Sequence, residues 1–285
     1  MDQFLFQVLT GVSFASLLFL VGAGFSITLV LMNVANLAHG SLYLIAAYVG
    51  MTVARGTGNF LAGLAAGVVA TSIASLPVQR VFARLSSFPA QILVGIGLLN
   101  IVQAASLFFW GPHPYVLSAP ALLSGSVPVG DLQFSGYRLF LIGLSFVLGL
   151  VLWLGLERTR TGAVIRAGVE DQEMVRALGI NLTPVMFWTF LLGSSLAALA
   201  GVLGAPVTGI YIGLDFEILI FAFLVVVIGG TGSLKGAALA ALLVGVVDSL
   251  GKGYFSQLSA FSLYGPMVLI LAFRPYGLFG KKQGL

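Results

Sequence analysis

The chain has 285 residues, of which 59% are hydrophobic and only 8% are charged, with a formal net charge of +4. Soluble domains carry charge on roughly a quarter of their residues, so this composition excludes a soluble globular protein and a disordered chain, and the lack of cysteine excludes a disulfide scaffold. The long apolar runs also lack the alternation typical of membrane β-barrel strands. They predict an all-α, polytopic membrane helical bundle.

Nine apolar blocks follow one another along the chain, and a helix needs about 20 mainly apolar residues to cross a bilayer. The count of membrane segments is eight or nine, because the first two blocks are nearly continuous, as are the seventh and eighth. Together they predict a single transmembrane domain over residues 1–285. The blocks lie near residues 4–32, 38–54, 59–77, 91–111, 139–157, 186–207, 217–230, 236–251 and 257–273.

The first polar interruption without a normal loop is the sequence NVANLAHGSLY at residues 33–43. If a helix starts near Asn36, then Asn36, His39 and Tyr43 share one face. A buried polar stripe in a membrane helix commonly faces a partner or a pathway. We therefore expect Asn36, His39, Ser41 and Tyr43 to line a translocation pathway. The alternative is hydrogen bonding between helices that only holds the bundle together.

The second interruption is the sequence GGTGSLKG at residues 229–236, and it adds Gly229, Gly230, Gly232 and Ser233 to the predicted pathway. Gly-Ser-Leu occurs in both interruptions, which is a weak sign of an internal repeat. Transporters often carry repeats whose broken helices meet near the middle of the bilayer. Irregular backbone survives there only where protein or a water-filled cavity covers it.

Lysine and arginine are distributed unequally between the predicted loops. If the loops after the third and fifth blocks, the second interruption and the C-terminus face the cytoplasm, ten of the 13 basic residues lie inside. Arg55, Arg138 and Lys252 then lie outside. The positive-inside rule therefore predicts a cytoplasmic C-terminus and an outer loop at 112–138. The side of the N-terminus stays open.

The segment 158–185 is predicted to be a cytoplasmic loop with a concentrated set of charges. Its pattern predicts one amphipathic helix of about 12 residues that ends at Gly179. Met174, Val175 and Leu178 would form an apolar edge that a partner covers. The alternative is a solvated connector on the membrane surface.

Nothing in the sequence indicates an enzyme. No serine–histidine–acid or paired-carboxylate arrangement stands out, and the nearest match to a P-loop, from Gly245 to Lys252, has the wrong spacing. The second histidine, His113, lies far from His39, so no metal site is expected. We expect no catalytic residue and no cofactor in this chain. If ATP drives transport, the ATPase is a separate polypeptide; a secondary carrier and a passive channel are the alternatives.

Four stretches resemble the permease subunits of bacterial branched-chain amino-acid ABC importers, the LivH family. They are residues 36–40 with Tyr43, residues 166–181, residues 229–237, and the C-terminal sequence FRPYGLFG at residues 273–280. The chain departs from the family at Ser41, where an acidic residue is common, and at Met174 and Val175, where small alanines are common.

This resemblance implies an ABC importer permease fold and a set of partners. The partners are a second homologous permease subunit, two ABC ATPase subunits that bind the ATP, and a periplasmic solute-binding protein, without nucleic acid. The implied solutes are branched-chain amino acids or related small polar solutes, carried across the bacterial inner membrane. The resemblance also implies an ATPase-docking (coupling) helix that contains Arg166, Glu170, Asp171, Arg176, Gly179 and Asn181.

Overall fold

The computed structural model describes residues 2–32, 36–85, 87–130 and 132–255, and residues 257, 265, 268, 270, 272–274 and 277–279. Two short helices, α6 (Arg160–Glu170) and α7 (Gln172–Ala177), join two of its long helices, α5 and α8. The long helices of this part of the chain are α1 (Asp2–Met32), α2 (His39–Thr57), α3 (Phe60–Phe82), α4 (Phe88–Trp110), α5 (Gly136–Arg158), α8 (Leu182–Thr208), α9 (Leu214–Gly229) and α10 (Leu234–Tyr254).

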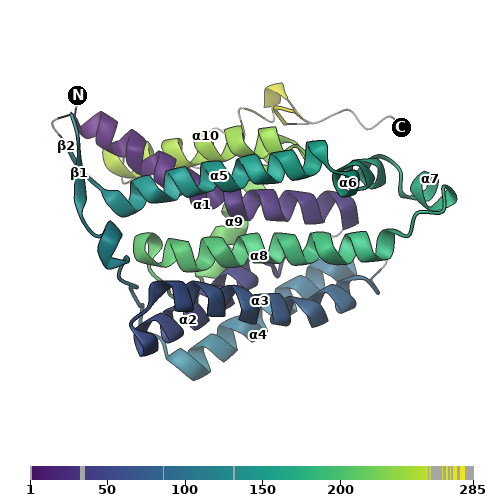
Figure 1. Cartoon of the computed structure of the whole chain (residues 1–285), viewed down its shortest axis with the longest axis horizontal. Helices are drawn as coiled ribbons and strands as arrows, with labels where there is room; N and C mark the ends of the chain where they lie inside the picture. The colour runs from purple at the N-terminus through teal and green to yellow at the C-terminus, as the bar shows by residue number, and fades with distance from the viewer. Residues whose placement is uncertain are drawn as a thin grey trace.

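Most of the long helices lie side by side. Helix α9, the shortest of them, lies behind α1 and α8 (Figure 1). Helix α1 packs against α5, α8, α9 and α10, and α8 separates α1 from α3. The N-terminus and the loop before α5 lie at one end of the bundle, and α6 and α7 project from the other (Figure 1). We call these the hairpin end and the loop end.

The loop at the hairpin end differs from the all-α expectation in one detail. Strands β1 (Ser126–Val129) and β2 (Leu132–Ser135) pair antiparallel within it. The turn between them uses Gly130 at φ +63°, a conformation that side chains other than glycine adopt rarely. An isolated bridge between Tyr115 and Ile210 ties the same loop to the segment that follows α8.

The predicted polytopic bundle is confirmed. Among the described residues, six helices are long and apolar enough to cross a membrane: α1, α3, α4, α5, α8 and α10. The outer helices expose large apolar side chains, among them Leu93, Phe108 and Phe146, and such surfaces are stable in lipid rather than in water. Eight of the nine predicted blocks are helices, and the ninth, 257–273, lies largely outside the described residues.

Glycines let the inner helices approach closely. A Cβ atom added at Gly201 of α8 would overlap the backbone oxygen of Tyr43 in α2, and one at Gly63 of α3 would overlap the backbone oxygen of Gly50 in α2. In a membrane, helices associate by close packing because lipid is as apolar as their own side chains. The many glycines within the spans therefore bring α2, α3 and α8 together.

Gly201 gives a test of this packing. We expect Gly201→Ala to destabilise the protein by about 1–3 kcal/mol, because the new methyl group forces α2 and α8 apart. Gly97→Ala in α4 is the matched control, since nothing lies within 4 Å of its added Cβ. Thermal unfolding in detergent, followed by size-exclusion chromatography, measures both. Equal melting temperatures for the two variants would contradict the account.

Candidate functional site

Helix α2 begins beside the middle of α1. The Nε2 atom of His39, its first residue, lies 3.2 Å from the carbonyl oxygen of Val21. From Val21, α1 continues to Met32, about 16 Å further at 1.5 Å per residue. The first residue of α2 therefore lies well inside the bundle, beside α1. Helix α1 ends at Met32 and α2 begins at His39, so the first interruption separates two helices, and its residues 33–35 lie outside the described part.

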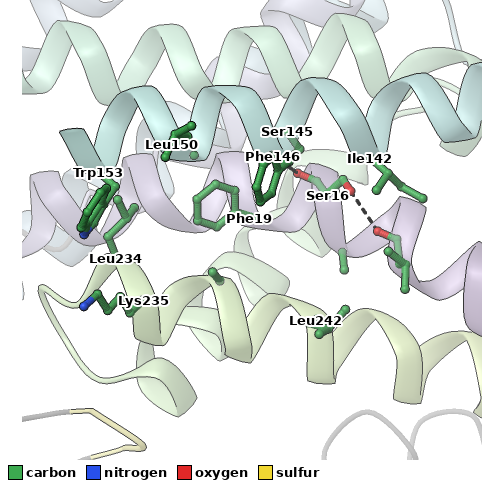
Figure 2. Close-up of a pocket in the computed structure, with 14 residues that line it drawn as sticks. Ser16, Phe19, Ile142, Ser145, Phe146, Leu150, Trp153, Leu234, Lys235 and Leu242 are labelled. Carbon is green, nitrogen blue, oxygen red and sulfur yellow. Dashed lines mark hydrogen bonds between the residues drawn. The ribbon is translucent and has the colours of Figure 1, made fainter. Parts of the chain in front are cut away.

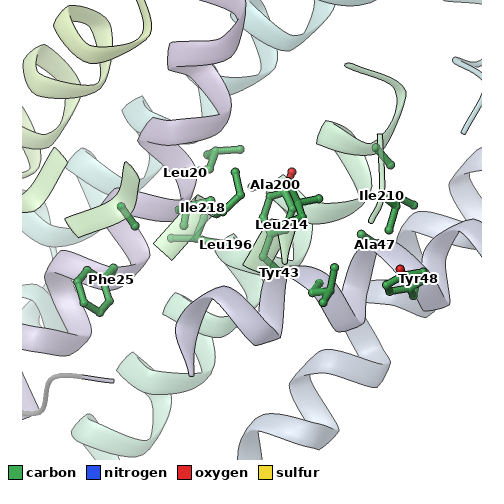
Figure 3. Close-up of a cluster of buried hydrophobic side chains, with 14 of the residues drawn as sticks. Leu20, Phe25, Tyr43, Ala47, Tyr48, Leu196, Ala200, Ile210, Leu214 and Ile218 are labelled. Atoms are coloured by element: carbon green, nitrogen blue, oxygen red, sulfur yellow. The ribbon is translucent and has the colours of Figure 1, made fainter. Parts of the chain in front are cut away.

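The first turn of α2 is closed in on all sides. Asn36, His39, Ser41 and Tyr43 are each 1% exposed. The backbone of Asp215, in the first turn of α9, lies against Gly40, and the His39 ring lies against that of Phe25, 5.4 Å between ring centroids. Figure 3 shows Tyr43 among apolar side chains of α1, α8 and α9, including Leu20, Leu196, Ala200 and Ile218.

Several polar atoms around this turn have no hydrogen-bond partner among the described residues. They are both side-chain polar atoms of Asn36, the Nδ1 of His39, the Oγ of Ser41 and the Oδ2 of Asp215. Each buried and unsatisfied polar group costs about 1–3 kcal/mol, and no bulk water is available inside a bilayer to reduce that cost. Such a cluster is expensive for a merely structural contact, which makes it a candidate functional site.

The second interruption is a tight connection between α9 and α10. Gly230 and Gly232 have φ of +90° and +79°, and the side chain of Ser233 accepts a hydrogen bond from the Gly236 N–H as the N-cap of α10. The N–H of Gly232 donates to the Oγ of Ser26 in α1 at 3.1 Å. Gly229 and Gly236 touch through their backbones, so a side chain at either position would clash.

The two interruptions therefore meet the same helix, α1, at neighbouring turns. His39 lies against Val21, and Gly232 lies against Ser26. No residue of either interruption lines the two cavities that the structure describes, apart from Leu234 and Lys235, which line the larger one. The translocation pathway through Asn36, His39, Ser41, Tyr43, Gly229, Gly230, Gly232 and Ser233 stays a prediction.

That larger cavity, of about 420 Å³, lies between α1, α5 and α10 (Figure 2). Its walls are chiefly apolar, with Phe19, Phe146 and Leu150 among them. Trp153 and Lys235 lie at one of its ends (Figure 2). An apolar groove on the outside of the bundle suits lipid chains better than a polar solute, so we do not assign it to the pathway.

The predicted single helix in the segment 158–185 is wrong. The chain forms α6 and α7, with a break at Asp171, whose backbone is extended at φ −155°. The Oδ1 atom of Asp171 accepts from the N–H of Met174 at 2.9 Å and so caps α7. An aspartate that caps a new helix competes with continuation of the previous one. Gly179 has the left-handed conformation expected after the end of a helix, with φ +79°.

The residues predicted to contact an ATPase are all exposed at the loop end. These are Arg166, Glu170, Asp171, Arg176, Gly179 and Asn181. Of the predicted apolar edge, Met174 and Leu178 are 63% and 73% exposed, but Val175 is buried. The surface is therefore open to a partner, while Val175 holds α7 in place.

This exposed segment is tied directly to α1. The Nε2 atom of Gln172 in α7 donates to the carbonyl oxygen of Leu31 at 2.7 Å. Gly168 of α6 packs against the Leu31 side chain as well as against Leu182 of α8. Leu31 is the penultimate residue of α1, so the loop between α5 and α8 holds the end of α1 that precedes the first interruption.

The sequence alone did not reveal the role of Asp215. It lies at the start of a predicted span, yet it is fully buried, and its Oδ1 atom accepts from the Nε2 of Gln103 in α4 at 2.9 Å. The available signal was Gln103, one of a few polar residues within the mainly apolar block 91–111. The charged cavity at the hairpin end, described below, was also missed, because its residues come from five separate helices.

Comparison with known proteins places the chain in a family. Residues 7–272 match the family described as "Branched-chain amino acid transport system / permease component". The chain belongs to this family. The permease protein LivH of Escherichia coli K12 is 30% identical over 309 residues, covering 99% of the chain and 98% of LivH. The permease protein BraD of Pseudomonas aeruginosa is 29% identical over 304 residues, covering 99% and 97%.

The predicted membership of the LivH family and the predicted function as a transport permease subunit are thus confirmed, and the relatives are transport permeases rather than enzymes. The fold has a counterpart in a solved structure, PsaBC from Streptococcus pneumoniae in complex with Fab. The TM-score is 0.51 at 14% identity, over 96% of this chain and 92% of the other. At this identity the likeness concerns the fold alone.

The contact between Gln103 and Asp215 gives a test of the closed site. We expect Gln103→Ala to lower the free energy of unfolding by about 1–3 kcal/mol, because it removes the side-chain donor of a buried carboxyl group. Asn100→Ala is the matched control on the same helix, since the Asn100 side chain is exposed and donates only to its own helix, at Ile96. Thermal unfolding of the purified variants measures the difference, and an equal effect of both would speak against a structural role for this contact.

Proposed function

We propose that this permease is one membrane subunit of an ATP-driven importer for branched-chain amino acids or related small polar solutes. A second homologous permease would complete the pathway, two separate ABC ATPases would bind the loop end, and a periplasmic binding protein would deliver the solute. The observation that carries the proposal is the hydrogen bond from Gln172 to Leu31. It connects the exposed loop, which the ATPases would contact, to α1, the helix that contacts both interruptions.

The orientation proposed is the one that the positive-inside rule favours. Arg55, Arg138 and Lys252, the three basic residues that it assigns to the outside, all lie near the hairpin end. Segments α6 and α7, with Arg166 and Arg176, lie at the opposite end. We therefore place the loop end and the C-terminus in the cytoplasm of a bacterial inner membrane. The N-terminus, at the hairpin end, would lie outside.

The proposed mechanism follows from these contacts. When ATP binding closes the ATPases, they displace α6 and α7, which pull on the end of α1 through Gln172 and Gly168. Because α1 contacts His39 on one side and Gly232 on the other, its displacement would open the closed turn of α2. The unsatisfied polar atoms of Asn36 and Ser41 would then meet the solute or water.

Coupling is tested at the predicted contact with the ATPase. We expect Glu170→Ala together with Asp171→Ala to lower solute uptake at least about tenfold while ATP hydrolysis continues, since the double change removes two exposed charges and the cap of α7. Uptake and ATPase activity are measured in parallel on the reconstituted complex.

Asp171→Asn separates the two effects, because asparagine caps a helix as well as aspartate does but carries no charge. Loss of coupling in Asp171→Asn would indicate that the charge of Asp171 contacts the ATPase. Loss only in Asp171→Ala would indicate that coupling depends on the conformation of the loop, which the Asp171 cap maintains. Normal uptake by the double variant would remove this segment from the coupling mechanism.

The transport class is tested by uptake of radiolabelled leucine into vesicles that contain the complete complex. We expect uptake to need both ATP and the binding protein. Uptake by this chain alone along an ion gradient would favour a secondary carrier, and passive flux through it would favour a channel. Matched vesicles whose ATPase subunits cannot hydrolyse ATP serve as the control.

A further inference from the structure

A second cavity, of about 390 Å³, opens at the hairpin end of the bundle. Residues from the hairpin-end parts of five helices, together with the segment after α8, surround it. Both polar and apolar side chains line it. Its volume falls in the range of binding sites for small ligands. The charged residues in its lining are Arg138, Glu217, Asp248 and Lys252.

Two of these charges neutralise one another. The Nζ atom of Lys252 lies 2.8 Å from the Oδ2 of Asp248, one turn earlier on α10. Lys252 also lies over the rings of Phe14 and Phe221, at 5.8 and 6.0 Å from the centroids. Asp248 is almost fully buried and has Lys252 as its ionic partner, so the two charges of this pair cancel.

The other two charges have no ionic partner within the described part of the chain. The Nη1 atom of Arg138 donates to the Oγ1 of Thr10 at 3.0 Å, which uses one of its five N–H groups. The Oε2 atom of Glu217 accepts from the Tyr211 hydroxyl at 2.5 Å, which leaves its other oxygen available. Each neutral partner orients its charged group without cancelling the charge.

We propose that this cavity is a binding site for a small zwitterion, a free α-amino acid with an apolar side chain. The guanidinium group of Arg138 would hold the α-carboxylate, and the carboxylate of Glu217 would hold the α-ammonium group. An anion alone would leave Glu217 unpaired, and a cation alone would leave Arg138 unpaired.

The rest of the lining fits the apolar side chain of such a ligand. Phe14, Val207, Leu214 and Ile218 supply the apolar part of the cavity wall. Burial of a branched aliphatic side chain against them stabilises the complex by about 25 cal/mol for each Å² removed from water. The lining therefore favours leucine-like amino acids over small or acidic ones.

The cavity lies on the side where a solute would enter. This assignment rests on the proposed function and on its orientation, in which the hairpin end faces the binding protein. The site would receive the amino acid before the deeper turn at His39 opens. None of the predicted pathway residues lines it.

The absence of cysteine from the chain makes the site directly accessible to experiment. Thr208→Cys places a single thiol in the cavity wall, and its rate of reaction with a membrane-impermeant maleimide is measured on the purified complex in nanodiscs without binding protein. We expect leucine to slow the reaction. Two analogues, 3-methylbutylamine without the carboxylate and 4-methylpentanoic acid without the ammonium group, should protect at least about tenfold less well.

Two further variants then test the assigned groups in the Thr208→Cys background. Arg138→Gln and Glu217→Gln should each raise the leucine concentration needed for half-protection about tenfold or more. Arg55→Gln removes a positive charge at the same end but outside the cavity, where Arg55 donates to the Val116 carbonyl, and it should leave protection unchanged. Melting temperatures of all variants show whether each folds.

The outcomes separate this inference from the proposed function. If leucine uptake depends on ATP but leucine does not slow the maleimide reaction, the site is overturned and the importer stays in place. The same holds if leucine slows the reaction equally well in the Arg138→Gln and Glu217→Gln variants. Protection by the amine or the acid alone overturns the zwitterion assignment. If leucine is not taken up, the maleimide measurements are repeated with other free amino acids. If none of them slows the reaction, the site is also overturned.

Discussion

The structure depends on one constraint, that backbone polar groups inside a bilayer must find partners within the protein. Two interruptions place irregular backbone deep in the bundle, and α1 covers both of them. His39 lies against the Val21 carbonyl, and the Gly232 N–H donates to Ser26. The length of α1, 31 residues, lets one helix serve both and still reach the loop end. Its position explains why it packs against four other long helices.

A helix with this position is also a mechanical connection. Its internal hydrogen bonds make α1 stiff, so in the proposed mechanism a force at Leu31 would act on the turns at Val21 and Ser26 without a chain of side-chain rearrangements. The close approaches at glycines serve the same purpose, because backbones in contact, as at Gly24 and Gly193, leave little space for independent movement. The proposed coupling therefore needs only a rigid α1 held by Gln172 at one end.

The sequence predicts those features of the fold that are determined by residues close together in the chain. Long apolar blocks identify the spans, and clusters of glycine and polar residues identify the two interruptions, because both signals lie within short stretches. The loop between α5 and α8 has the periodicity of one helix, but the side chain of Asp171 caps a second helix and so divides the segment in two. The contact of Gln103 with Asp215, 112 residues apart, depends on helix packing that periodicity does not encode.

The cavity at the hairpin end and the closed turn at His39 differ in their charged groups. At the hairpin end, Arg138 and Glu217 line a cavity and have no ionic partner among the described residues. Around His39 the bundle is closed, the unsatisfied groups of Asn36 and Ser41 are neutral, and the carboxyl group of Asp215 accepts a hydrogen bond from Gln103, as burial in an apolar surrounding demands. In the proposed mechanism, an amino acid that leaves the outer site would lose Arg138 and Glu217 as charge partners and would reach the closed turn of α2, beside the buried carboxyl group of Asp215. Passage through the centre would then be the step that needs external work, and that work would arrive through α1.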